Sequence, residues 1–356
     1  MPFFTPAPKP SSLLGYHRVL APSAGVKVSP LCLGAMNFGN NWKDFMGECD
    51  KDQSFALLDA FFKLGGNFID TIATKYTTGY RSSHRDTEPL QSNFVGNSIK
   101  SMRVSVDRSL KKLQTDYIDL LYLHWWDFTT SVEEVMHGLN NLVTSGKVLY
   151  LGVSDTPAWV VVKANDYARA HGLRPFSVYQ GRWNAGFRDL EREIIPMCRD
   201  QGMAIAPWAP LGQGKFKSAE ARSNEAEAGS ARASNLTEDD IKVSDALEKV
   251  AKRKGTTLHA IALAYVMHKT PNVFPIIGQR KIEHLKANIE ALGVRLSNED
   301  LDEIDAASSF DIGFPMNFIF QDGYSSRNTA ADVRLTKASA LIDAPAHPSP
   351  VLPRQE

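Results

Sequence analysis

An acid and a base lie only a few positions apart in the segment GGNFIDTIATKYTTGY, residues 65–80. An apolar run precedes Asp70, and Lys75, Tyr76 and Tyr80 follow it. Both charges lie where the carboxyl end of a buried strand is expected. A tyrosine hydroxyl is a weak proton donor that an adjacent lysine ammonium, paired with a carboxylate, makes more effective. The spacing therefore suggests acid–base chemistry, although a lone aspartate at a strand end is more often a turn or cap residue.

The rest of the chain alternates short apolar strands with amphipathic helices. Continuously apolar strands between helices indicate a parallel sheet that is buried on both faces. No GxGxxG motif follows the first strand, so a doubly wound dinucleotide-binding fold is not favoured. We predict an α/β fold, a (β/α)8 TIM-type barrel with an N-terminal hairpin. Seven strands are clear, one fewer than a closed barrel needs; they cover residues 33–39, 67–70, 117–125, 147–154, 176–180, 203–208 and 273–278.

Composition and segment boundaries limit the possible classes of protein. Forty basic residues balance 40 acidic ones, which gives no sign of nucleic-acid or anionic-membrane binding. The three cysteines are widely spaced and form no cluster with histidine, so neither a disulfide scaffold nor a metal site is expected. We predict a flexible N-terminus over residues 1–15, a barrel over residues 16–322 and a tail over residues 323–356. A signal peptide and a membrane span are not expected, and the cytoplasm is the expected compartment.

Three long segments in order along the chain resemble the aldo-keto reductase superfamily: KKLQTDYIDLLYLHWWD, GKVLYLGVSDTPAWVV and FSVYQGRWN. More narrowly, they resemble its branch of fungal aryl-alcohol dehydrogenases and norsolorinic acid reductase-like proteins. The resemblance covers most of residues 16–310. It implies an NADPH-using (β/α)8 barrel that reduces aldehydes or ketones. It also implies four catalytic residues at the carboxyl ends of strands: an aspartate after the second, a tyrosine just beyond it, a lysine after the third and a histidine after the fourth.

The motif FIDT supplies the aspartate as Asp70, ATK supplies the lysine as Lys75, and YLHWW supplies the histidine as His124. In the family a helix and a strand, roughly 30 residues, separate the aspartate from the lysine. Only four residues separate them here. We therefore predict that the barrel lacks one βα repeat, in the region of helix 2 and strand 3, and that the catalytic tyrosine is lost with it.

Two tyrosines are candidates to replace the missing acid. Tyr76 lies six residues after Asp70, one position later than the usual family spacing. If Tyr76 takes that role, Lys75 cannot hold the third-strand position, because adjacent residues cannot come from two different strands. Tyr80 lies further along a loop rich in threonine and glycine and is less constrained. A further alternative is an error of gene prediction at the junction of Thr71 and Ile72, with the true protein carrying the full repeat.

The strand ends on the other side of the barrel resemble the family more fully. In the family, the positions of Ser154, Asp155 and Gln180 hydrogen-bond the nicotinamide carboxamide, and an aromatic ring at the position of Trp208 stacks on the nicotinamide. Residues 212–240 are predicted to be a mobile loop on the cofactor side. The cations near residue 280 lie at a helix N-terminus, a good phosphate site, and favour NADPH over NADH. The predicted cofactor-binding residues are Asp70, Ser154, Asp155, Gln180, Trp208, Ala209, Pro210, Leu211, Gly212, Lys215, Gly278, Gln279, Arg280, Lys281, His284 and Asn288.

We predict an NADP(H)-dependent oxidoreductase that reduces an aromatic or polyketide-like aldehyde or ketone by hydride transfer, in secondary metabolism. His124 and Trp125 are predicted to contact the substrate, and Trp42, Trp126 and Trp183 are candidate aromatic walls. Packing is the alternative role for Trp125 and Trp126. The alternative function is an NADP(H)-binding barrel with little or no turnover, acting as a sensor or subunit. The only partner expected is a small carbonyl or alcohol.

Overall fold

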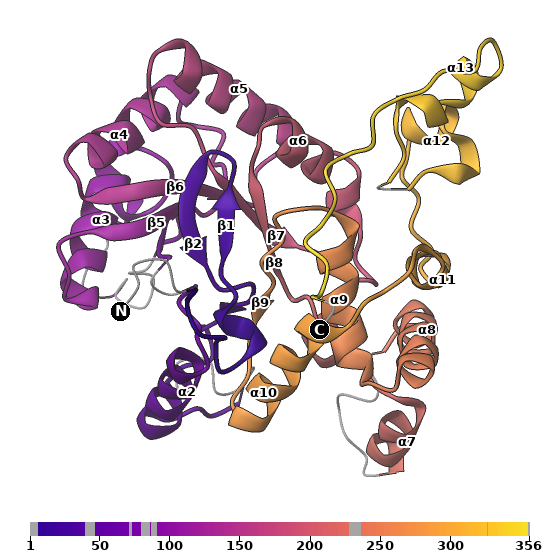
Figure 1. Cartoon of the computed structure of the whole chain (residues 1–356). Helices are drawn as coiled ribbons and strands as arrows, with labels where there is room; N and C mark the ends of the chain where they lie inside the picture. Colours follow the sequence, from indigo (N-terminus) through magenta and orange to yellow (C-terminus); the bar gives the residue numbers. More distant parts are fainter. Residues whose placement is uncertain are drawn as a thin grey trace.

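The computed structural model describes residues 6–39, 47–70, 73–79, 86, 91–227, 236–325 and 327–354. Near the N-terminus, strands β1 (Arg18–Ala21) and β2 (Ala24–Val28) form the predicted antiparallel hairpin. Its apolar side chains pack with residues from the amino ends of the barrel strands, so the hairpin closes that end of the barrel. Figure 1 shows the hairpin in indigo, within the ring of helices.

The parallel strands follow one another in the order of a barrel. β4 (Lys75–Tyr76), β5 (Ile118–Leu123), β6 (Val148–Ser154), β7 (Val178–Arg182) and β8 (Ala204–Trp208) form one sheet. β3 (Cys32–Leu33) pairs with β9 (Ile276–Ile277). Isolated parallel bridges extend this pair on both sides, from Leu33 to Ile69 and from Val273 to Ile205 of β8. Eight strand segments are therefore found among the described residues, as a (β/α)8 barrel requires.

The predicted loss of one repeat holds for the helix but not for the strand. The segment ATKY, which the sequence places four residues after Asp70, forms β4 and pairs in parallel register with Tyr122 and Leu123 of β5. No helix lies between Ile69 and β4 in the described part of the chain, and the Ala73 amide donates a hydrogen bond to the Ile69 carbonyl. No strand pairing between Ile69 and β4 is found in these described segments, so the ring of strands has a seam at this point.

Seven helices of the barrel cover its outside: α2 (Lys51–Lys63), α3 (Ile99–Leu113), α4 (Val132–Thr144), α5 (Ala158–Ala170), α6 (Ile194–Asp200), α9 (Leu258–Lys269) and α10 (Ile282–Glu290). Figure 1 shows them arranged around the strands. Side-chain caps fix several helix starts, and Ser131 caps α4 by accepting a hydrogen bond from the Glu134 amide. No helix of the described residues is long and apolar enough to cross a membrane.

The buried side chains divide into an inner and an outer group, as the two-residue period of strands requires. Leu120 and Tyr122 of β5 belong to the inner group, inside the barrel, together with Val178, Ala204 and Ala206. Their neighbours on the same strands belong to the outer group, between the strands and the helices. Residues that continue the inner row past a strand's carboxyl end must therefore face the mouth of the barrel.

The segments predicted to be loose contain ordered elements. Residues Leu13–Gly15 form a short 3-10 helix with Leu14 fully buried, so the N-terminal segment is already packed before residue 16. The stretch 212–240 includes the 3-10 turn Gly212–Gly214, helix α7 (Ala219–Glu227) and the start of α8 (Glu238–Lys254). In each case short apolar or alanine-rich sequence suffices for local structure, which composition alone does not reveal.

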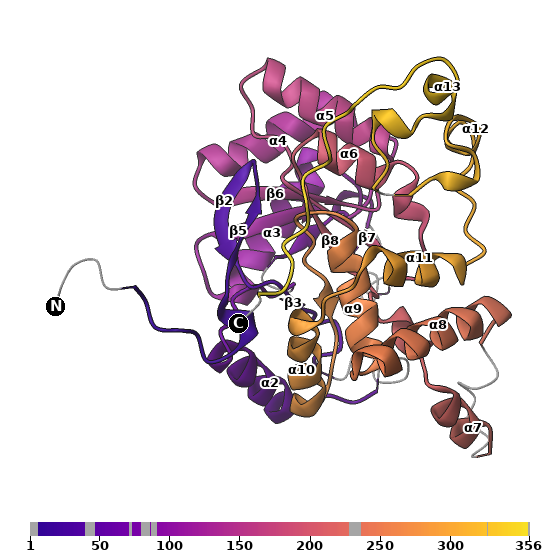
Figure 2. The same ribbon diagram turned by 45° about the vertical axis from the view of Figure 1, so that its right-hand side comes forward.

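The C-terminal region leaves the barrel after α11 (Asn298–Ala306) and carries the short helices α12 (Met316–Ile319) and α13 (Arg334–Lys337). Figure 2 shows both short helices on the outside of the molecule. The tail is tied back at its end, where the Arg354 guanidinium lies 4.3 Å from the centre of the Tyr16 ring. The end of the tail thus contacts the segment that precedes the N-terminal hairpin.

Candidate active site

Asp70 and Lys75, the pair with which the sequence analysis began, form an ion pair at the mouth of the barrel. Lys75 Nζ lies 2.8 Å from Asp70 Oδ1, and both side chains are about four-fifths buried. Gln180, in the middle of β7, donates its Nε2 hydrogen to the same oxygen over 2.9 Å. The ammonium also lies 5.2 Å from the centre of the Tyr122 ring, a cation–π contact. The short turn therefore still brings the aspartate and the lysine together, despite the missing helix.

His124 continues the inner row of β5 and lies beside this pair. Burial and the nearby Lys75 charge lower the pKa of the His124 imidazole below its usual range, so the ring is neutral at pH 7. Thr78 Oγ1 lies 2.7 Å from Nδ1 of His124 and accepts a hydrogen bond of 2.9 Å from Nε1 of Trp125. A hydroxyl donates one hydrogen bond while it accepts others, so Thr78 can donate to Nδ1, and the imidazole proton then lies on Nε2. His124 is then a neutral N–H donor.

A hydrogen-bond network holds the two loops that carry Thr78 and His124. Thr77 is buried with φ at 104°, a conformation rarely adopted by β-branched residues. Asn97 Nδ2 donates to Thr77 Oγ1 over 2.9 Å and to the Trp125 carbonyl over 3.0 Å. The Asn97 and Asp127 amides each donate to the other residue's side chain over 2.7 Å. Asn97 thus fixes the loop after β4 against the loop after β5.

Tyr76 is not the replacement acid. It follows Lys75 on β4, so its side chain points to the opposite face and lies in the outer group, 2% exposed. Its hydroxyl has no hydrogen-bond partner among the described residues, and burial raises the pKa of that hydroxyl far above its usual range. Lys75 and Tyr76 cannot hold the lysine and tyrosine positions of the family at the same time, and the structure assigns the third-strand position to Lys75. Tyr80, the other candidate, lies outside the described residues.

The position of Tyr76 yields a prediction about stability and turnover. Tyr76→Phe removes a buried hydroxyl that makes no hydrogen bond, so the free energy of unfolding should rise by about 1 kcal/mol. Any NADPH-dependent turnover should stay unchanged, because the side chain lies outside the barrel. Urea denaturation and a steady-state assay of the same preparation measure both quantities. Loss of turnover in a folded Tyr76→Phe protein would contradict this placement.

The predicted cofactor-binding residues at the ends of β6 and β8 lie at the same rim. Ser154 continues the inner row of β6, and its Oγ is buried without a hydrogen-bond partner. Asp155 follows with φ at 40°, and its amide donates to the Gln180 carbonyl. Trp208 is half-buried at the end of β8, and the Ala209 carbonyl beyond it accepts from Asn184. Pro210, Leu211 and Gly212 lead into the 3-10 turn after this strand.

The predicted residues near α10 lie at the adjoining edge. Gln279 is buried, its Nε2 finds no partner in the described part of the chain, and its Oε1 lies 3.4 Å from Nδ2 of Asn288. The Arg280 guanidinium lies against Gly47, where any side chain would collide with it. Gly278, Lys281 and His284 are exposed. Lys215 departs from its predicted role, because its Nζ pairs with Asp240 at 2.7 Å instead of standing free over the site.

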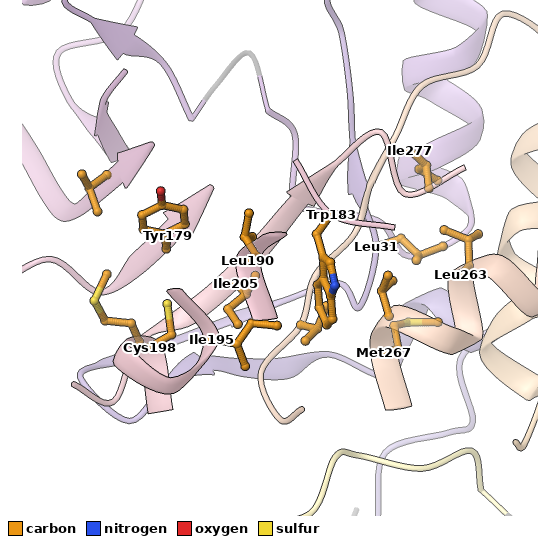
Figure 3. Packing of buried hydrophobic residues seen from close by; sticks show 14 of the residues in the cluster. Leu31, Tyr179, Trp183, Leu190, Ile195, Cys198, Ile205, Leu263, Met267 and Ile277 are labelled. Atoms are coloured by element: carbon orange, nitrogen blue, oxygen red, sulfur yellow. The ribbon is translucent and has the colours of Figure 1, made fainter. Parts of the chain in front are cut away.

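Two of the tryptophans predicted as pocket walls are core residues. Trp183 is fully buried, and Figure 3 shows it among apolar side chains that include Leu190 and Leu31. Its indole N–H donates to Glu191, so its role is packing. Trp126 is also buried in the outer group. Trp183 follows Arg182, a residue of the inner row of β7, and therefore points away from that row. Trp125 remains half-buried beside His124, and Trp42 lies outside the described residues.

One cation at the mouth was not among the predicted site residues. Arg182 lies two residues beyond Gln180 on β7 and so faces the same way, next to Trp208 in the register of the sheet. Its guanidinium lies 4.2 Å from the centre of the Phe187 ring and 5.8 Å from that of Trp208. The sequence contained a signal for Arg182, because side chains two residues apart on a strand face the same way and Gln180 was already a predicted site residue. Thr78 and Asn97 had no comparable signal, because both lie in irregular loops.

Known proteins with similar sequences belong to one family. The sequence model of the aldo/keto reductase family matches residues 30–85 and 71–309. Norsolorinic acid reductase A of Aspergillus parasiticus is 52% identical over 379 residues, which cover 98% of this chain and 96% of the relative. An aryl-alcohol dehydrogenase of Pestalotiopsis microspora is 51% identical, with 90% and 88% covered. The aryl-alcohol dehydrogenase [NADP(+)] of Phanerodontia chrysosporium is 47% identical, with 91% and 93% covered.

The family match is divided at the same place in the chain as the shortened connection between Asp70 and Lys75. The match comes in two segments, and residues 71–85 belong to both of them. The alignment with the Aspergillus relative is also longer than the 356 residues of this chain, so the relative has positions without a counterpart here. The interruption is local, and the match on either side of it covers most of the chain. The chain belongs to the aldo/keto reductase family.

Proposed function

We propose that this member of the aldo/keto reductase family, an oxidoreductase, uses NADP(H) to reduce aldehydes or ketones that carry an aromatic ring. The observation that carries the proposal is the group formed by Asp70, Lys75 and Gln180 beside His124. It places an ammonium and a neutral imidazole N–H at one point of the barrel mouth. Relatives named norsolorinic acid reductase and aryl-alcohol dehydrogenase support the class of substrate and a place in secondary metabolism.

Each residue of this group has a role that follows from its chemistry. Reduction of a carbonyl builds negative charge on its oxygen, which preorganised donors and positive charge stabilise. His124 would donate its Nε2 hydrogen to that oxygen, and the Lys75 ammonium would add positive charge and a proton source. Asp70 holds Lys75 in place through their ion pair. The part-exposed Trp125 offers an apolar face to an aromatic substrate.

The residues at the opposite rim fit a nicotinamide cofactor, which supplies the hydride when bound. Among the described residues the buried Ser154 hydroxyl and the buried Gln279 Nε2 find no hydrogen-bond partner, and unsatisfied polar groups of this kind are costly unless a ligand completes them. Ser154 and Gln180 would hold the carboxamide, and Trp208 would contact the ring. Arg280 and Lys281 would hold the phosphate at the adenosine end. The unpaired, buried cysteines are in keeping with a cytoplasmic location.

Substitution of the lysine tests the proposed function. Lys75→Met should lower NADPH oxidation by aromatic aldehydes by about 10²-fold or more, since the variant removes the charge and proton source beside the carbonyl. NADPH affinity should change little, because the proposed cofactor residues lie on other strands. Lys63→Met, on the exposed face of α2, is the matched control. A wild-type protein that oxidises no NADPH with any aromatic aldehyde would overturn the proposed activity.

The choice between NADPH and NADH yields a separate prediction. Charge-assisted hydrogen bonds to the extra phosphate contribute roughly 1.5–3 kcal/mol, so Arg280→Ala should narrow the preference for NADPH by about tenfold or more. Quenching of tryptophan fluorescence measures the affinity for each cofactor. Lys286→Ala, exposed on the helix α10 that follows Arg280, should leave the preference unchanged. Equal titration curves for the two cofactors with the wild-type protein would contradict the assignment.

A second candidate function is cofactor binding with little turnover, as in a sensor or subunit. The observation that favours it is the lack of a suitably placed tyrosine. No tyrosine among the described residues presents its hydroxyl to Lys75 and His124 from the mouth of the barrel. Tyr122 lies below them, fully buried, and burial raises the pKa of its hydroxyl well above the usual range. Tight NADPH binding without aldehyde-dependent oxidation would favour this candidate over the first.

A further inference from the structure

Arg182 faces the mouth of the barrel from its own place on β7. The inner row of this strand runs from Val178 through Gln180 to Arg182, and Gln180 already reaches Asp70 at the centre of the site. Gly181, between them, faces the outer side, where a side chain would meet Leu190. The alternation of the strand therefore places the guanidinium one level above Gln180, at the entrance to the site.

The guanidinium is held by aromatic rings and not by a carboxylate. It lies against the Phe187 and Trp208 rings, and Trp208 is the residue at the end of the neighbouring strand. Among the described residues no acidic side chain pairs with Arg182, and its Nε atom is buried without a hydrogen-bond partner. A planar cation that is always charged, partly buried and short of acceptors is suited to a carboxylate-like group.

We infer that Arg182 binds an anionic oxygen group, a carboxylate or a phenolate, on the aromatic carbonyl compound. The inference rests on the proposed function, because it names the class of substrate for the same mouth. Phosphate groups of the cofactor are the other source of anionic oxygen. The cations proposed for them, Arg280 and Lys281, lie beyond β9, and β8 separates that edge of the barrel from β7. Arg182 thus recognises acidic aryl aldehydes and ketones in preference to neutral ones.

Equilibrium binding of two matched compounds tests this preference without any need for turnover. Para-carboxybenzaldehyde and its neutral methyl ester are titrated calorimetrically into the full-length protein, with and without saturating NADP+. The wild type should bind the acid more tightly than the ester. Arg182→Met should weaken binding of the acid by about 10- to 100-fold, the effect of one charge-assisted bond, and leave the ester unchanged. Arg174→Met, an exposed cation near the amino end of the same strand, should change neither.

The outcomes separate the inference from the proposed function. A wild-type protein that binds the ester as tightly as the acid overturns the inference, whatever the variants do. Weaker NADP+ binding by Arg182→Met with the acid–ester preference intact also overturns it and assigns the residue to the cofactor phosphates. If Arg182→Met does not fold, Arg182→Lys, which keeps the charge, should retain part of the preference; full loss counts against the inference. Failure of NADPH oxidation removes the proposed reduction but leaves the cofactor-free titration decisive for Arg182.

Discussion

Inserting the missing segment should raise the reduction of aromatic aldehydes by at least about 10²-fold, the low end for gaining a general acid. The segment is taken from Norsolorinic acid reductase A of Aspergillus parasiticus and placed between Thr71 and Ile72. The family pattern places a tyrosine there, just beyond the strand that ends in Asp70. Lys75 and His124 already lie together at the mouth, so the inserted hydroxyl would join a group that is otherwise assembled. Steady-state rates at saturating NADPH measure the gain.

The matched control is the same insertion with its tyrosine changed to phenylalanine. This control restores the helix and closes the seam between Ile69 and β4 without restoring the acid. It should therefore gain stability but not turnover, whereas NADPH affinity should be similar in all three proteins. If the phenylalanine version is as active as the tyrosine version, the seam and not the hydroxyl limits the enzyme. If wild-type turnover already equals that of the relative, the chain has another proton donor and the account of the missing tyrosine is wrong.

The sequence was sufficient for the barrel and for most of the residues at its rim. Strand–helix alternation predicted the parallel sheet, because each strand is buried on both faces and so reads as a continuous apolar run. The strand ends then located Asp70, Lys75, His124 and Gln180, which the structure brings within one group. Their association follows from topology alone, since the carboxyl ends of parallel strands meet at one edge.

What the sequence did not reveal depends on which way a side chain points. Tyr76 and Trp183 each follow an inner residue by one position, and the pleat sends both to the outer side. The predicted number of strands was one too low for another reason. Within ATKY the strand is only two residues long, Lys75–Tyr76, and it follows so closely on the apolar run before it that the sequence shows no separate strand. Contacts such as Thr78 with His124 depend on a strained loop at Thr77, and no periodic pattern predicts such a loop.

A buried ion cluster on the far side of β7 should be the part of the fold most sensitive to a single substitution. Lys269 is fully buried, and its Nζ lies 2.7 Å from Asp305 and 3.1 Å from Glu191. Arg188 pairs with Glu191 at 2.9 Å, and the Glu191 carboxylate also accepts from Trp183. Two cations thus balance two anions. Removing one partner of such a group leaves a buried charge uncompensated, which costs far more than the intact group contributes.

Lys269→Met should therefore lower the free energy of unfolding by about 3–5 kcal/mol, measured by urea denaturation at pH 7. Lys252→Met is the control, since it breaks the 2.8 Å pair with Glu248 on the exposed face of α8 and should cost about 0–1 kcal/mol. Equal losses for the two variants would show that the buried cluster contributes no more than a surface pair. Turnover of the folded fraction should not change, because the cluster lies outside the barrel mouth.

The pH dependence provides a second test of the same cluster. Burial alone would raise the pKa of the Glu191 carboxyl, but Lys269 and Arg188 outweigh it and hold that pKa below its usual range. A depressed carboxyl pKa contributes stability that is fully present above the unfolded value of about 4.3 and is lost as pH falls through the folded value. Without Lys269 the pKa of Glu191 in the folded protein rises. In the variant, Glu191 therefore becomes protonated and loses its uncompensated charge at a higher pH than in the wild type. The stability difference between wild type and Lys269→Met should accordingly narrow as pH falls from 7 to about 4. A difference that stays constant over that range would mean that Glu191 is not ionised through its contact with Lys269.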